Sequence, residues 1–187
     1  MGAPLTVARR LISVEDYRAM AQAGVLREGE RVELIEGELI QMVPAGGPHI
    51  HLLNYLNAVL VPQVGNDGVV SPQNPVILLP NSEPEPDLVI LRSECRRSRE
   101  VPKASDVLLV VEISVTSRDY DRDVKLPLYA RYGVPEAWML EPLTHGVTMY
   151  RDPMPNGYKT VIVPKPNDVI SPLLLPSVKV DLADLWA

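Results

Sequence analysis

The spacing of hydrophobic and polar residues predicts a series of short helices and strands. Between His49 and Val64, leucine and valine recur at steps of three and four residues, which is typical of an amphipathic helix, and Gly65 marks its end. Short apolar runs bounded by proline, glycine or aspartate predict strands elsewhere. These runs are RVELIEGELIQMV, GVVSPQNPVILLP, DLVIL, LLVVEIS, EAWML, VTMYR and YKTVIV.

The N-terminal part of the chain predicts a helix followed by a hairpin. Residues 13–16, SVED, resemble a capping box, which would open a short helix that ends at Gly24. The run 31–43 is divided by a Glu-Gly pair at 36–37, and this division predicts a β-hairpin. We expect residues 1–11 to form a loose leader.

From residue 49 onward the predicted order is helix, strand, strand, strand, helix, strand. In the second helix, YDRDVKLPLYARYG, Pro127 must lie in the first turns or kink the helix. Helices in this order cover a mixed sheet, so we expect an α/β (α+β) fold that carries the N-terminal helix and hairpin as an extension. A length of 187 residues suits a single domain, 1–187.

Composition and charge limit the possible functions of the protein and its expected location in the cell. The net charge is -6, whereas proteins that coat nucleic acid are usually basic, so a nucleic-acid role would require a local basic patch. The single cysteine, Cys95, excludes an internal disulfide and a cysteine zinc site. No apolar run approaches the ~20 residues that span a bilayer, and the N-terminus lacks the apolar segment of a signal peptide. We therefore expect a cytoplasmic protein without a membrane partner.

An ionisable residue lies inside an otherwise apolar strand. The run LLVVEIS, residues 108–114, predicts a buried strand, yet it contains Glu112. Burying an ionised carboxylate is costly unless it is paired or binds a metal. Glu112 and Asp87, at the entrance of the strand DLVIL, would together suit Mg²⁺ or Mn²⁺, which prefer oxygen ligands. The alternatives are a buried salt bridge from Glu112 to Lys125 or Arg118, and a turn role for Asp87.

Two further positions could serve the same site. Asp121 and Lys125 are four residues apart on one helical face, where they form either a surface ion pair or a functional pair. In the functional case Lys125 reaches the strand ends and activates a water or counters the charge growing on a phosphate. His49, at a helix start, either satisfies terminal backbone groups or binds a metal or a phosphate in a cleft.

A basic loop, residues 92–105, contrasts with the acidic chain. It joins the two strands that carry the proposed carboxylates, so we expect it to begin and end near the proposed site. The loop is either a solvated, mobile segment or a source of phosphate contacts. The residues that would make those contacts are Arg96, Arg97 and Arg99.

Several separated segments resemble the Uma-two family, a restriction-endonuclease-like branch of the PD-(D/E)XK nuclease superfamily. The resemblance covers nearly the whole chain from Ser13 onward, with the motifs in the right order. The segments are VELIEGELIQMVPAGGPH, SPQNPVILLPNSEPEPDLVILR, DVLLVVEISVTSRDYDRDVKLPLYARYGVPEAWML and PSVKVDLADLW. The predicted order of helices and strands also matches the core of that superfamily.

The resemblance assigns catalytic and metal-binding roles to particular residues. The Pro-Asp of the superfamily matches Pro86 and Asp87, and its acidic residue on the following strand matches Glu112. The superfamily lysine normally follows two residues later, where this chain has Ser114. By analogy, the main-chain carbonyl of Ile113 would be a further metal ligand.

The resemblance implies that this branch replaces the motif lysine by the lysine of an Asp-x-x-x-Lys sequence on the next helix. Asp121 and Lys125 match that sequence. Glu33 and His49 match positions that the branch places around the same cleft. The resemblance thus implies a Mg²⁺- or Mn²⁺-dependent endodeoxyribonuclease, a hydrolase acting on DNA, with homodimers as in nucleases that cut two strands. The rival interpretation is an inactive interaction module with a nuclease fold, which the displaced lysine and the acidic net charge favour.

Overall fold

The structure of the protein is a computed structural model that describes residues 9–27 and 29–187. The leader expected at residues 1–11 therefore lies largely outside the described part. Within that part, no helix is both long enough and apolar enough to cross a membrane.

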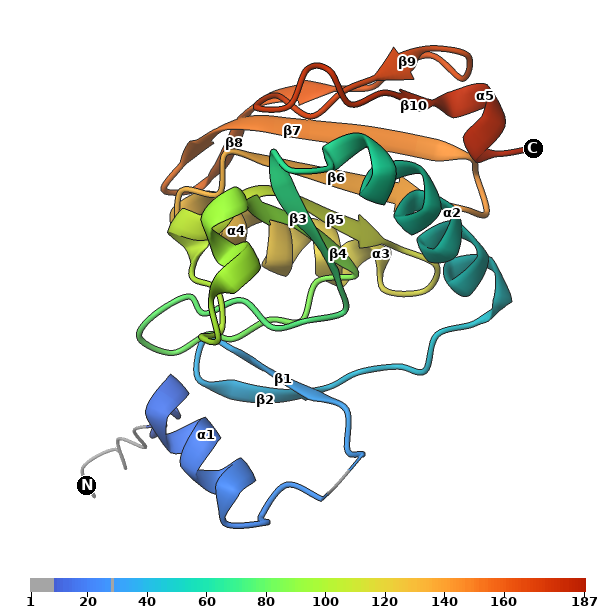
Figure 1. The fold of residues 1–187 in the computed structure, drawn as a ribbon. Coiled ribbons are helices and arrows are strands. Elements are labelled where there is room, and N and C mark those ends of the chain that lie inside the picture. Colours follow the sequence, from blue (N-terminus) through green and yellow to red (C-terminus); the bar gives the residue numbers. More distant parts are fainter. Residues whose placement is uncertain (1–8, 28) are drawn as a thin grey trace.

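A helix and a hairpin form the N-terminal extension, which lies below the main sheet in Figure 1. The helix α1 (Val14–Gln22) opens with the predicted capping box. The strands β1 (Val32–Ile35) and β2 (Glu38–Gln41) pair antiparallel. Both residues of their turn have positive φ, Glu36 at 49° and Gly37 at 84°, as in a two-residue hairpin.

Six strands form the central sheet in the order β3-β4-β5-β6-β7-β8. Only β5 and β6 are parallel neighbours; the other neighbouring pairs in this sheet are antiparallel. This mixed sheet flanked by helices confirms the predicted fold class. The strands are β3 (Gly68–Pro72), β4 (Leu88–Arg92), β5 (Val107–Ile113), β6 (Glu136–Glu141), β7 (Gly146–Met154) and β8 (Gly157–Ile162).

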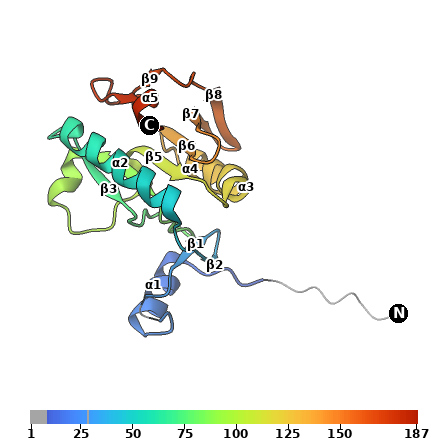
Figure 2. The ribbon, with the colours of Figure 1, turned by 90° about the vertical axis from the view of Figure 1, so that its right-hand side faces the viewer.

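Helices cover the two faces of the sheet (Figures 1 and 2). The long helix α2 (Gly47–Val64) packs its leucines on one face, together with the C-terminal helix α5 (Leu182–Leu185). On the other face lie α3 (Arg118–Tyr120), the π-helical segment η3 (Asp121–Lys125) and α4 (Leu126–Arg131).

The strand β5 is buried along its whole length because both of its faces are covered. Leu109 and Val111 belong to the apolar layer under α2, whereas Val110 belongs to the layer under α4. Double burial explains the unbroken apolar run in the sequence. Because side chains alternate along a strand, Glu112 points to the same face as Val110.

Other short elements complete the chain. The predicted strand GVVSPQNPVILLP is a strand only as far as Pro72, and beyond it Ile77 and Leu78 form isolated bridges. Proline lacks a backbone N–H, so Pro72 and Pro75 limit the pairing. The remaining elements are the 3₁₀-helices η1 (Ser93–Arg97) and η2 (Ala104–Asp106) and the short strands β9 (Val169–Ile170) and β10 (Val180–Asp181).

The register of β4 and β5 places the carboxylates of interest together. The two strands are antiparallel with Leu88 opposite Val111. Asp87, just before β4, and Glu112, near the end of β5, therefore lie at the same end of the sheet.

The same register contradicts the expectation that the basic loop begins and ends near this site. A connection between two antiparallel strands joins the end of the first to the start of the second, which is the far end here. Four residues of β4 separate Asp87 from Arg92, the first residue of the loop, and Arg92 lies about 17 Å from Asp87 along the strand.

Candidate active site

A cleft of about 440 Å³ lies at the end of the sheet where β4 begins and β5 ends. Its walls come from the segment between β2 and α2, the first turn of α2, the residue before β4, the end of β5 and the helical segment after it. Six of the residues singled out in the sequence line it: His49, Asp87, Glu112, Ile113, Asp121 and Lys125. Glu33 lies behind this wall, in contact with Lys125.

Asp87 is held by hydrogen bonds on both of its oxygens. The backbone N–H of Ile113 donates to Oδ2 over 2.7 Å, and the Nε2 of His49 lies 2.7 Å from Oδ1. An ionised carboxylate only accepts, so His49 donates through Nε2. His49 is buried, and its Nδ1 has no partner in the described part of the chain. His49 therefore lines the cleft and contacts Asp87, while its binding of a metal or a phosphate stays a prediction.

Glu112 is 2% exposed and pairs with the helix that follows its strand. Its Oε1 lies 2.9 Å from the Nζ of Lys125 and accepts a hydrogen bond of 2.6 Å from the hydroxyl of Tyr129. Of the two partners considered in the sequence, Lys125 is therefore the one observed, while Arg118 pairs with Glu141. Burial raises the pKa of Glu112 to about 8, even though Lys125 acts to lower it.

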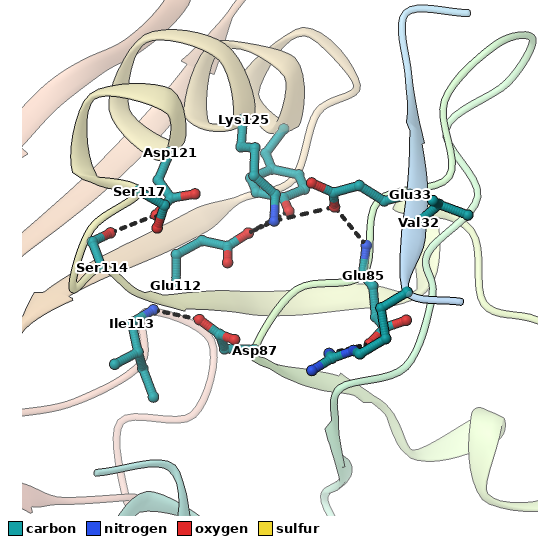
Figure 3. A network of polar contacts seen from close by, with 12 residues as sticks. Val32, Glu33, Glu85, Asp87, Glu112, Ile113, Ser114, Ser117, Asp121 and Lys125 are labelled. Carbon is teal, nitrogen blue, oxygen red and sulfur yellow. Dashed lines mark hydrogen bonds and ion pairs between the residues drawn. The ribbon is translucent and has the colours of Figure 1, made fainter. Parts of the chain in front are cut away.

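Lys125 is shared by two buried carboxylates, as Figure 3 shows. Its Nζ lies 3.3 Å from Oε2 of Glu33, which also accepts a hydrogen bond from the backbone N–H of Glu85. Burial alone would lower the pKa of Lys125, but Glu112 and Glu33 raise it above its ordinary value. The ammonium therefore stays charged. The interpretation of Lys125 and Asp121 as a surface ion pair is wrong, because both are buried and the lysine contacts Glu33 and Glu112 instead.

Asp121 accepts hydrogen bonds from two hydroxyls of the segment that joins β5 to α3. Ser114 Oγ donates to its Oδ2 over 2.7 Å and Ser117 Oγ over 2.6 Å. Ser114 occupies the place of the lysine of the superfamily motif, and its hydroxyl links that place to the helix that supplies Lys125. The strand end and the helix are thereby fixed to each other.

The local helix geometry follows from Pro127. Proline has no N–H to donate, and its ring would clash with the carbonyl four residues earlier in a regular α-helix. Just before it, the chain forms a π-helical turn in which the N–H of Leu126 donates to the carbonyl of Asp121. Lys125 and Tyr129, four residues apart, both contact Glu112 from this helix. Tyr129 was missed in the sequence, although its spacing from Lys125 was a usable signal.

The side chains of the cleft fit a hard divalent cation by chemistry, although they do not form a closed cage. In the described part of the chain, no group of three or more His, Cys, Asp or Glu side chains is arranged to hold a metal ion. Besides Glu85, which pairs with an arginine, four carboxylates lie in or beside the cleft: Glu33, Asp87, Glu112 and Asp121. The one buried lysine among the described residues contacts only two of them, Glu33 and Glu112. A divalent cation would balance this excess of negative charge. Metal ligation by Asp87, Glu112 and the carbonyl of Ile113 stays a prediction.

One cation of the cleft was not predicted from the sequence. Arg31 lines the cleft, is partly exposed, and pairs with Glu85 at 2.9 Å. By contrast, Arg96 donates to the carbonyls of Gly65 and Gly68 and so holds the turn after α2. The loop arginines Arg96, Arg97 and Arg99 do not line the cleft.

The mixed sheet with flanking helices, and the acidic cleft at the end of its two adjacent strands, define a protein of the restriction-endonuclease-like class. The model of the family Uma2, described as "Putative restriction endonuclease", matches residues 14–183, and the chain belongs to this family. The resemblance found in the sequence is thereby confirmed.

A solved structure is similar in fold. It is a crystal structure described as "a putative nuclease belonging to DUF820" from Anabaena variabilis ATCC 29413. The TM-score is 0.69 at 16% sequence identity, over 94% of this chain and 97% of that chain. No curated protein matches the sequence.

Proposed function

We propose that this protein is a metal-dependent endonuclease that hydrolyses phosphodiester bonds in DNA. The family and the similar fold support a nuclease. The observation that carries the proposal is the presence of Asp87, Glu112 and Lys125 in one cleft. They come from three separate elements, and Glu112 is buried at a cost that a purely structural strand would avoid.

In this proposal Asp87, Glu112 and the main-chain carbonyl of Ile113 hold Mg²⁺ or Mn²⁺. A cation held there would lower the pKa of a bound water and polarise the scissile phosphate. His49 orients Asp87 through Oδ1, leaving the second lone pair of each oxygen of Asp87 for the cation. Lys125 supplies positive charge at the cleft wall, where it stabilises the added negative charge of the phosphate.

Binding of the DNA backbone is assigned to Arg31. It is the exposed arginine of the cleft, and its partner Glu85 holds it at the rim. An arginine can exchange one carboxylate for a phosphate at little cost, because its planar donors fit both.

Cleavage assays on plasmid and single-stranded DNA with Mg²⁺ or Mn²⁺ test the function. We expect the wild type to cut. Changing a residue that only orients a metal ligand typically costs about 10- to 100-fold in activity. Changing a ligand itself, in Asp87→Asn or Glu112→Gln, should therefore lower the cleavage rate by at least about 100-fold. The matched control is Glu15→Gln, an exposed carboxylate outside both the cleft and the basic loop, which should cut like the wild type.

The second candidate is an inactive module with a nuclease fold, favoured by the serine at the place of the motif lysine. Metal binding separates the two. A wild type that cuts none of these substrates and binds no Mn²⁺ would support the module and overturn the endonuclease.

A further inference from the structure

The two oxygens of Glu112 lie in unlike surroundings. Oε1 lies 2.9 Å from the ammonium of Lys125 and accepts a hydrogen bond of 2.6 Å from the hydroxyl of Tyr129. Oε2 receives no hydrogen bond from the described residues. One oxygen is thus saturated by protein donors, and the other is left for a ligand in the cleft.

Tyr129 is built rigidly into the fold. It is fully buried in α4, within the apolar layer that α4 forms against β5 and β6. In the described part of the chain, the hydrogen bond that its hydroxyl donates goes to Glu112. A buried phenol normally needs such a partner, and here the partner is a carboxylate of the candidate active site.

We propose that Tyr129 is a positioning residue, which with Lys125 holds Oε1 of Glu112 and so would leave Oε2 for the cation. This inference rests on the proposed function. It adds a residue to which the family resemblance assigned no role.

The physical reason is the freedom of the carboxylate. The terminal torsion of glutamate is broad, so packing alone does not decide which oxygen faces the cleft. Two donors on Oε1 restrict that rotation and leave the remaining oxygen in place before the cation arrives. Partners of this kind, which orient a metal ligand from behind, typically change metal affinity by about 10- to 100-fold.

Mn²⁺ binding to the full-length protein tests the proposal without relying on activity. Free Mn²⁺ is measured by electron paramagnetic resonance during a titration. Tyr129→Phe keeps the ring and removes the donor, so we expect about 10- to 100-fold weaker binding. The matched control is Tyr158→Phe. It also belongs to the α4 layer, but its hydroxyl donates to the carbonyl of Val134 over 2.9 Å, and its Mn²⁺ affinity should stay that of the wild type.

The outcomes separate this proposal from the proposed function. Suppose that the wild type binds Mn²⁺, Glu112→Gln does not, and Tyr129→Phe binds as the wild type does. The metal site then stands and the role of Tyr129 is overturned, even if the variant melts at a lower temperature. If the wild type and Glu112→Gln instead bind Mn²⁺ equally well, Glu112 is not a metal ligand. The proposed metal site and the proposal for Tyr129 are then both rejected.

Discussion

Lys125 determines how charge is distributed in the site. In the described part of the chain it is the only buried lysine or arginine, and it serves two carboxylates that enter from different elements, Glu33 from β1 and Glu112 from β5. A buried ion group of this kind adds little net stability when complete but is costly to break. The lysine is therefore both a candidate catalytic residue and a structural one.

Removing this lysine should destabilise the fold. Lys125→Ala leaves Glu33 and Glu112 buried without a cation, and we expect a loss of about 3–5 kcal/mol in the free energy of unfolding. Urea denaturation of the metal-free protein measures it. The control is Lys165→Ala at an exposed position, which should change the free energy by less than about 0.5 kcal/mol.

The loss should also depend on pH. Burial already raises the pKa of Glu112 to about 8, and without Lys125 the pKa rises further. A carboxyl with a raised pKa in the folded state stabilises the fold at low pH, and that contribution disappears as the pH rises through the folded pKa. We therefore expect Lys125→Ala to lose more free energy of unfolding, relative to the wild type, at about pH 9 than at about pH 6. Equal deficits at both pH values would contradict the ion group described here.

Among the elements, the β1–β2 hairpin matters because it brings Glu33 to Lys125. Leu34, next to Glu33, accepts a hydrogen bond of 2.7 Å from the N–H of Glu83, which attaches the hairpin to the segment before β4. Its turn depends on Gly37, where an added Cβ would lie 2.5 Å from the Cβ of Leu11. The hairpin thus links the residues before α1, which contact its turn, to the candidate site.

Gly37→Ala should weaken this coupling. The substitution combines a positive φ of 84° with a clash against Leu11, so we expect at least about 2 kcal/mol of destabilisation in urea denaturation. Gly133→Ala is the matched control, because Gly133 also has a positive φ, 76°, but has open space around it. Its cost should be about 1 kcal/mol. A similar cost for the two variants would mean that the contact with Leu11 is not close in solution.

For the whole molecule, the proposed function requires DNA to approach a protein with a net charge of -6. The cleft itself holds more carboxylates than cations, and the basic loop lies at the opposite end of β4 and β5. Metal ions and Arg31 would therefore have to offset the repulsion locally. The role of Arg96, Arg97 and Arg99 as phosphate contacts stays a prediction, and a DNA that uses them must extend well beyond the cleft.

The salt dependence of DNA binding distinguishes the two ends of the sheet. In a non-cleaving Glu112→Gln background, Arg31→Ala should flatten the slope of log affinity against log salt by about 0.9 on duplex DNA. Fluorescence anisotropy at several salt concentrations gives the slope. The comparison variant carries both Arg97→Ala and Arg99→Ala. For it we expect a smaller change in the salt slope per arginine removed than for Arg31→Ala. A flattened slope in that variant alone would show that DNA enters from the end of the basic loop.

The sequence by itself determined the order of the elements and the pair of carboxylates. The helix at 49–64 and the strand at 108–114 follow from spacing and branched side chains, which act over a few residues. Asp87 and Glu112 could be brought together by the family motifs, since these mark positions on two consecutive strands. The capping box and the hairpin turn at Gly37 were likewise local signals.

Only the tertiary structure decided which groups contact these carboxylates. Glu33 and Lys125 are far apart in the sequence, and their ion pair depends on how the hairpin docks against the helix. The partner of Tyr129 and the position of Arg31 at the cleft also come from packing, which no periodicity along the chain reports. The basic loop was misplaced for a related reason: an antiparallel register puts the connection between two strands at the end opposite to Asp87 and Glu112, and register is a property of pairing between strands.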